Sequence, residues 1–62
     1  MDNNKVKVYN VSDNAVRFPW MVIRFVEGDF WYYGSWNKIE DAARCAAEVG
    51  GAAVPTHVVL EA

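Results

Sequence analysis

Seven aromatic side chains lie within seventeen residues of this 62-residue chain, in the stretch 20–36. They are Trp20, Phe25, Phe30, Trp31, Tyr32, Tyr33 and Trp36. Successive side chains of a β-strand point to opposite faces of the sheet, so the run 30–33 cannot hide all of its rings on one side. We therefore expect large apolar surface to face outward, where it needs a second layer, a partner or a ligand.

A chain of this length forms a single small domain, 1–62, of which we expect residues 1–4 to be flexible. So short a chain buries only about 60% of the surface that it exposes when unfolded. The one cysteine, Cys45, excludes an internal disulfide, and the one histidine, His57, argues against a zinc site. We expect no metal and no cofactor, which leaves association into a homodimer as the way to add stability.

Six basic residues are outnumbered by eight acidic ones, which gives a net charge of −2. This balance disfavours a nucleic-acid partner, although a local basic patch can exist on an acidic protein. The chain contains no apolar stretch as long as a membrane span, and residues 1–4 lack the features of a signal peptide. With a free thiol in addition, the expected location is the cytoplasm, without membrane contact.

The pattern of residues predicts three strands within the stretch 5–36. The first, 5–11, places Val6 and Val8 on one face and Lys5, Lys7 and Tyr9 on the other. Residues 11–15 are expected to be a turn, because serine, aspartate and asparagine bond their own backbone. Strands 21–26 and 30–36 then form a hairpin around Gly28.

Two registers of this hairpin are open. A three-residue turn, 27–29, pairs Val26 with Phe30 and puts Arg24 on the same face as Phe30 and Tyr32. A two-residue turn, 27–28, instead groups Phe25 with Phe30 and Tyr32. We favour the first register, because it leaves the charged Arg24 on the face with fewer rings.

A helix is predicted over 38–49, with Asn37 as its N-cap, Glu40 completing a capping box and Gly50 ending it. Its apolar stripe consists of Ile39, Ala42, Ala43, Ala46 and Val49. A short strand, 56–60, follows. The predicted fold class is α+β: a three-to-four-stranded antiparallel sheet with one helix packed on one face, in the order β-β-β-α-β. One helix covers roughly 10 Å of sheet, about two strands, so we expect the opposite face to stay open.

The open face carries the predicted partner-binding residues. The helix is expected to cover Trp31, Tyr33 and Trp36, whereas nothing in the favoured register covers Phe30 and Tyr32. Together with Arg24 and the edge residue Trp20, these two rings form the candidate contact for a protein partner. The alternative interpretation of the aromatic cluster is core packing alone.

Basic residues offer a second candidate site. If the first strand pairs with the second, Lys5 and Lys7 join Arg24 on the open face, and Arg17 completes the possible nucleic-acid-binding set. Basic groups between aromatic rings suit single-stranded nucleic acid or an acidic protein surface. The alternative is that these charges only solubilise an edge strand.

The spacing of nucleophiles, acids and bases gives no support for catalysis. Neither Cys45 nor His57 has the neighbours of a catalytic pair, and Glu27 and Asp29 flank a tight turn. We therefore predict no catalytic residue, and a protein that is not an enzyme but acts by binding.

The segment 31–36, Trp-Tyr-Tyr-Gly-Ser-Trp, followed by 39–44, Ile-Glu-Asp-Ala-Ala-Arg, resembles the last strand and the helix of the ethylene-response-factor (apetala-type) DNA-binding domain and of the N-terminal domains of phage integrases. The resemblance covers about half of the chain. It implies a three-stranded sheet with a packed helix, and an open face on which Arg24, Phe30 and Tyr32 contact DNA.

In size and style the chain also resembles the small early proteins of bacteriophages that bind and disable a host factor. The function that we expect is therefore a non-enzymatic interaction module, a phage or mobile-element inhibitor or adaptor that binds a host protein in the host cytoplasm. A DNA-binding domain of the integrase-arm type is the alternative.

Overall fold

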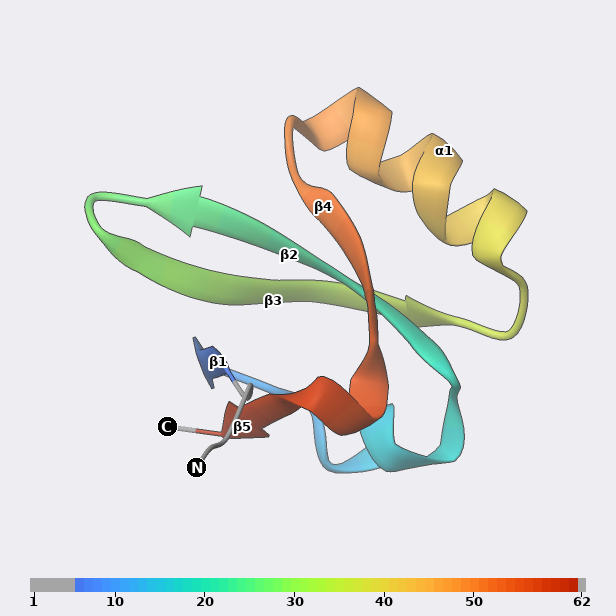
Figure 1. Ribbon diagram of the computed structural model, residues 1–62, viewed down its shortest axis with the longest axis horizontal. Coiled ribbons are helices and arrows are strands. Elements are labelled where there is room, and N and C mark those ends of the chain that lie inside the picture. Colours follow the sequence, from blue (N-terminus) through green and yellow to red (C-terminus); the bar gives the residue numbers. More distant parts are fainter. Residues whose placement is uncertain (1–5, 62) are drawn as a thin grey trace.

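The structure is a computed structural model that describes residues 6–61; the predicted flexible start, 1–4, and Lys5 lie outside this range. Its elements, in chain order, are β1 (Val6–Tyr9), the 3-10 helix η1 (Asp13–Arg17), β2 (Trp20–Val26), β3 (Asp29–Trp36), α1 (Ile39–Val49), β4 (Ala52–Pro55), the 3-10 helix η2 (Thr56–Val58) and β5 (Val59–Glu61) (Figure 1). The α+β class and the order of three strands, one α-helix and a further strand are confirmed. No helix in the described range is long and apolar enough to span a membrane.

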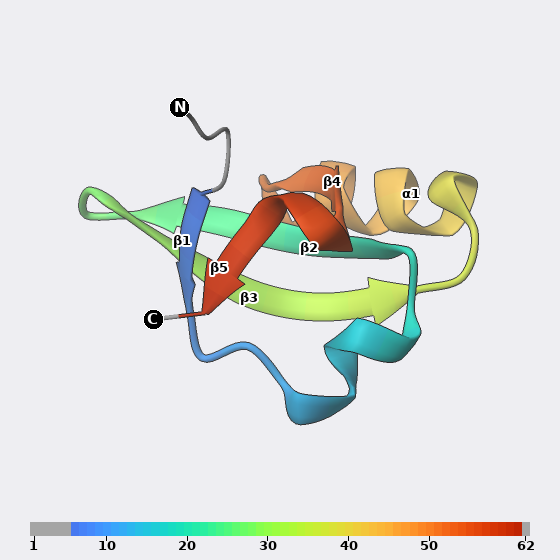
Figure 2. The same cartoon turned by 60° about the horizontal axis from the view of Figure 1, so that its bottom comes forward.

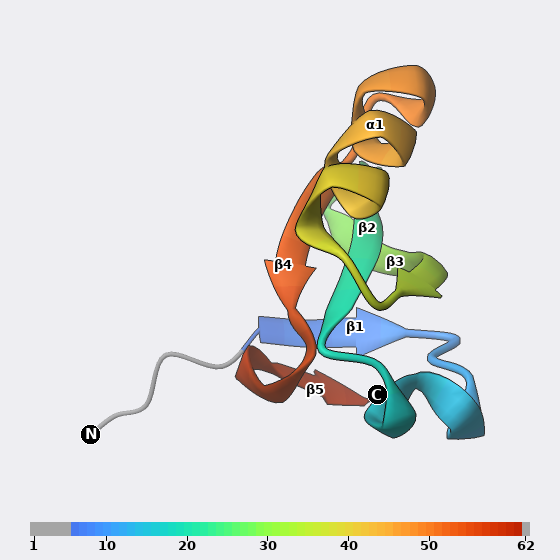
Figure 3. The same cartoon turned by 90° about the vertical axis from the view of Figure 1, so that its right-hand side faces the viewer.

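The sheet is mixed, whereas the sequence predicted antiparallel pairing. Its strand order is β4-β2-β3-β1-β5. The pairs β2–β3 and β2–β4 are antiparallel, but β1 runs parallel to both β3 and β5. The first strand therefore does not pair with the second, because β3 and β4 occupy the two edges of β2. The sheet is strongly curled, and β1 and β5 cross below the rest of it (Figure 3).

The hairpin adopts the register that we did not favour. Phe25 pairs with Phe30 and Val26 with Asp29, so the turn has two residues, Glu27 and Gly28. Both adopt positive φ, 50° and 91°. Such a turn matches the twist of the two strands, and this backbone preference outweighs the placement of one arginine. Arg24 is consequently on the opposite face from Phe30 and Tyr32.

A β-bulge at Tyr33 interrupts the hairpin, because Ile23 pairs with Tyr32 while the neighbouring Val22 pairs with Gly34. The extra residue bends and twists the bulged strand. It also places Tyr33 and Gly34 on one face, the face that carries α1. A Cβ at Gly34 would lie 2.6 Å from the Trp36 ring, so glycine allows this ring to pack directly on the strand.

The α-helix begins at Ile39, and its N-cap is Lys38 rather than the predicted Asn37. No side chain bonds this cap, since an ammonium group has no acceptor atom. The predicted end is confirmed: Gly50 adopts a φ of 71°, and the Gly51 N–H donates to the Ala46 carbonyl at 2.8 Å. The buried stripe is narrower than predicted, because Ile39 and Ala43 are exposed.

The C-terminal segment forms two short strands in place of the single predicted strand 56–60. Residues 52–55, expected to be a connection, form β4 along β2, with Pro55 opposite Trp20. Proline is tolerated there because β4 is an edge strand. The chain then turns through η2 to bring β5 beside β1.

Both faces of the sheet are covered in part, which corrects the prediction of one bare face. On one face Val22 packs with Ala42 and Ala46 of α1. On the reverse face Met21 and Ile23 pack with Val8 of β1 and Ala15 of η1. Figure 2 shows α1 and η1 on opposite sides of β2 and β3. Residues 11–15, expected to be only a turn, thus supply part of the second layer.

Candidate functional site

Phe30 and Tyr32 lie in the reverse-face core and are not the exposed contact that the sequence predicted. Both are half-buried and pack against Val8, Met21 and Ile23. The Tyr32 hydroxyl is 2.6 Å from Ser35 Oγ, so its polar end has a partner inside the protein. In this register the alternative interpretation, core packing, describes these two rings.

Two exposed rings, Trp31 and Tyr33, were expected to lie under the helix. Trp31 is 42% and Tyr33 51% exposed, whereas Trp36 is half-buried beside Val22, Ala42 and Ala46 as predicted. The helix covers the end of β3 near Trp36 and stops short of Trp31. The bulge and the two-residue turn together determine which rings of β3 are exposed, because each moves alternate side chains to the other face.

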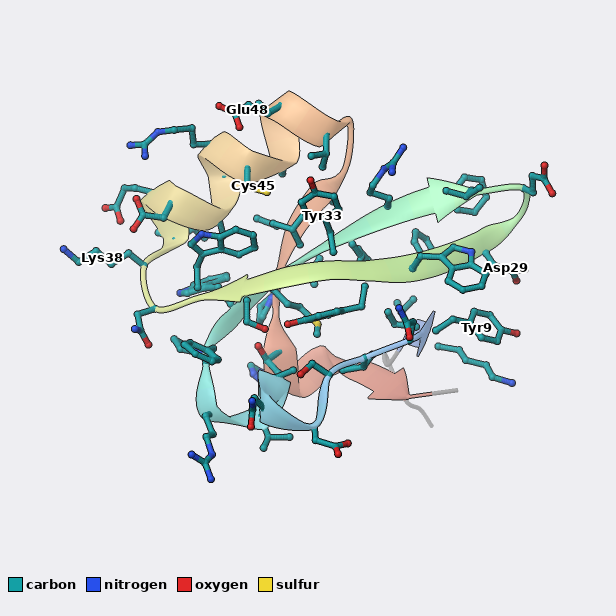
Figure 4. The ribbon with its side chains drawn as sticks, turned by 180° about the vertical axis from the view of Figure 1, so that it is seen from behind. Tyr9, Asp29, Tyr33, Lys38, Cys45 and Glu48 are labelled. Atoms are coloured by element: carbon teal, nitrogen blue, oxygen red, sulfur yellow. The ribbon has the colours of Figure 1, made fainter. Side chains whose placement is uncertain are left out.

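Five side chains lie on the α1 side of the sheet, beyond the end of the helix. We call this set the aromatic face; it consists of Lys7, Tyr9, Arg24, Trp31 and Tyr33. Tyr9 pairs with Trp31 across the parallel strands β1 and β3, and Arg24 pairs with Trp31 across the hairpin. Tyr33 stands two residues further along β3, nearer α1, while Tyr9 lies toward the turn of the hairpin (Figure 4).

The rings of the aromatic face support one another. The centroids of Tyr9 and Trp31 are 5.2 Å apart with an angle of 32° between the ring planes. The Lys7 ammonium lies 5.7 Å from the Tyr9 centroid, within the distance of a cation–π contact. These contacts hold the rings in place before any partner arrives, which lowers the entropic cost of binding.

Positive charge flanks the rings on two sides. Lys7 and Arg24 are both exposed, and neither forms an ion pair with a side chain in the range 6–57. The carboxylates nearest along the hairpin, Glu27 and Asp29, lie at its turn end. The middle of the aromatic face therefore presents two cations beside exposed indole and phenol rings.

The described members of the predicted basic set, Lys7, Arg17 and Arg24, lie in two separate places. Lys7 and Arg24 lie on the same face of the sheet, on the strands that flank β3, although the first strand does not pair with the second as that prediction required. They lie beside Tyr9 and Trp31 and not beside Phe30 and Tyr32. Lys5 lies outside the described residues. Arg17 lies away from this surface, at the end of η1, where it lines a groove together with Trp20.

This groove runs between the segment 16–20 and the segment 55–57 and has a volume of about 810 Å³. We call it the η1–η2 groove; its lining consists of Val16, Arg17, Phe18, Pro19, Trp20, Pro55, Thr56 and His57. The Thr56 N–H donates to the Pro19 carbonyl at 3.0 Å and so ties the two segments together. Trp20 and Arg17 belonged to two different predicted sites, whereas in the structure both line this one groove.

Cys45 is half-buried on α1, as expected for a structural cysteine. Burial raises the pKa of its thiol above the ordinary value, and the Glu48 carboxylate raises this pKa further. At neutral pH the group is therefore a thiol and a poor nucleophile. Within the described range no three histidine, cysteine or acidic side chains are grouped so that they can hold a metal ion.

Tyr9, Trp31 and Tyr33 are the members of the aromatic face that the sequence analysis missed as binding residues. The signal that could have found them is the Glu27–Gly28 pair, since glycine in a two-residue turn fixes the register. Comparisons of the chain with protein-family models, with curated proteins and with solved structures find no match.

Proposed function

We propose that this protein is a non-enzymatic interaction module that binds another protein through the aromatic face. The observation that carries the proposal is the exposure of Trp31 and Tyr33, 42% and 51%, on the same side of the sheet as Arg24. Tryptophan, tyrosine and arginine are the residue types that dominate the binding energy of protein interfaces.

A protein partner with acidic groups fits this surface best. Lys7 and Arg24 complement carboxylates, and Tyr9 and Trp31 provide a rigid apolar contact between them. The net charge of −2 disfavours an extended phosphate backbone as the main ligand. The setting that we propose, an inhibitor or adaptor of a phage or mobile element acting on a host protein, rests on the resemblance in size and style.

The experiment is affinity capture from a bacterial lysate with three immobilised proteins. The double variant W31A/Y33A removes the two exposed rings, while F25A removes a ring that is 63% exposed on the opposite face. We expect wild type and F25A to enrich the same proteins, and W31A/Y33A to lose them at least tenfold, as for interface hot spots of about 1.4 kcal/mol or more.

Circular dichroism of the three proteins checks that the fold is kept. Equal enrichment by all three would contradict the proposal, because the aromatic face would then contribute nothing to binding.

Single-stranded nucleic acid is the second candidate partner, and the positions of Lys7 and Arg24 favour it. Bases stack on exposed rings, and flanking cations contact the phosphates. The integrase-arm type of DNA binding has less support, since Arg24 does not share a face with Phe30 and Tyr32. The test is a titration of the protein with fluorescent single-stranded and duplex oligonucleotides at several salt concentrations. Micromolar affinity for the single strand at low salt, with a steep salt dependence, supports this candidate. If no micromolar binding occurs at low salt, single-stranded nucleic acid is not the partner.

A further inference from the structure

We propose that the η1–η2 groove is a second binding site, which holds a short acidic peptide with an apolar side chain next to its carboxylate. The groove lies at the Trp20 end of β2, away from Arg24 and the aromatic face. The inference is therefore independent of the proposed function.

The walls of the groove are apolar and fixed. Phe18 and Trp20 contribute rings, and Pro19 and Pro55 contribute rigid backbone on the two sides. Trp20 also packs against the core beneath α1, and the Thr56–Pro19 hydrogen bond joins the walls. A site built in this way is formed before the ligand arrives, and surfaces lined by aromatic rings are where extended peptides dock.

The charge of the lining selects an anion. Among the described residues that line the groove, Arg17 and His57 are the ionisable ones, and no carboxylate is present. The guanidinium of Arg17 is always protonated, is exposed and forms no ion pair with another described residue. A carboxylate on the ligand supplies the missing counter-charge, and the arginine fork can hold it with two hydrogen bonds.

Thr56, one of the residues that line the groove, carries a further polar group. Thr56 Oγ1 is buried and has no hydrogen-bond partner among the described residues. The volume of about 810 Å³ is in the range of sites for ligands of several hundred daltons, which favours a peptide of several residues over a single small acid.

The experiment uses the blocked pentapeptide Ac-Ala-Leu-Glu-Leu-Ala-NH2 and its neutral analogue with glutamine in place of glutamate. Each is titrated into the ¹⁵N-labelled full chain while amide shifts are followed by NMR. We expect the acidic peptide to shift Arg17, Trp20 and His57 saturably, with a dissociation constant on the order of 1 mM. The neutral peptide should bind about fivefold more weakly, as for a partly solvated charge pair.

The matched variants are R17Q, which removes the groove cation, and R44Q, which removes an exposed cation on α1. We expect R17Q to bind both peptides equally weakly and R44Q to behave like wild type. Three results would overturn the proposal: no saturable shift in the groove, equal affinity of wild type for both peptides, or binding of 3-phenylpropionate as tight as that of the acidic peptide. The comparison of the two peptides on wild type stands even if R17Q does not fold.

Discussion

Gly34 has no side chain, and for this reason the Trp36 ring can pack directly against the backbone at this position. The Trp36 ring lies over this residue, where a Cβ would be 2.6 Å from its outer edge. The ring cannot move without leaving its place beside Val22, Ala42 and Ala46. In a core that is packed this closely, even one added carbon atom has to displace its neighbours.

We expect Gly34→Ala to lower the free energy of unfolding by about 1–3 kcal/mol, the usual cost of overpacking. Urea denaturation followed by tryptophan fluorescence measures this loss. In a Trp36→Leu background the same substitution should cost clearly less, because the atoms that it meets are gone. If Gly34→Ala lowers the free energy of unfolding equally in both backgrounds, its effect arises from the backbone of the bulge and not from contact with the Trp36 ring.

The turn of the β2–β3 hairpin holds a glutamate in an unfavourable backbone conformation. Glu27 has a φ of 50° and Gly28 a φ of 91°. Glycine adopts positive φ freely, whereas glutamate does so at a cost and asparagine more readily than most residues. This element therefore carries local strain at one position only.

Glu27→Asn should stabilise the protein by about 0.5–1 kcal/mol, since asparagine followed by glycine is the preferred pair for this turn. The midpoint of thermal unfolding should rise accordingly. Asp29→Asn is the control, because it also removes one negative charge at the tip but leaves the two turn positions unchanged. A similar rise in both variants would mean that charge, and not the turn, is responsible.

The molecule as a whole has a small core for the surface that it exposes. Seven described residues are buried, and several large apolar side chains remain exposed on both sides of the hairpin. We expect the free protein to be a homodimer in which the aromatic face is covered by a second copy until a partner competes for it.

Light scattering should then report twice the chain mass of 7.0 kDa for wild type and for F25A, and the single mass for W31A/Y33A. A monomeric wild type would contradict the dimer. A dimer that survives the double substitution would place its contact elsewhere on the molecule.

Local chemistry allowed much of this architecture to be predicted. The alternation of Val6 and Val8 with Lys7, the hairpin around Gly28 and the helix end at Gly50 each depend on neighbouring residues, and each is confirmed. The strand order depends on pairings between distant segments, which no local pattern encodes. For that reason the parallel placement of β1, the packing of Ala15 and the division of β4 from β5 were not foreseen.

The exposed rings of the hairpin were expected at the wrong positions. Exposed rings next to Arg24 exist, but they are Trp31 and Tyr33 and not Phe30 and Tyr32. A difference of one residue in the turn exchanges the two faces of a strand, so a small error in register moved the whole predicted contact.

The pairing of β1 with β5 joins parts of the chain that are far apart in sequence, since Val6 lies opposite Val59. The hairpin, α1 and β4 can assemble through nearer contacts, while this edge has to close a loop of 53 residues for only three paired positions. Amide hydrogens along this edge should therefore exchange with deuterium ahead of those in β2 and β3. A nascent chain, moreover, cannot complete its sheet until residue 61 has been translated.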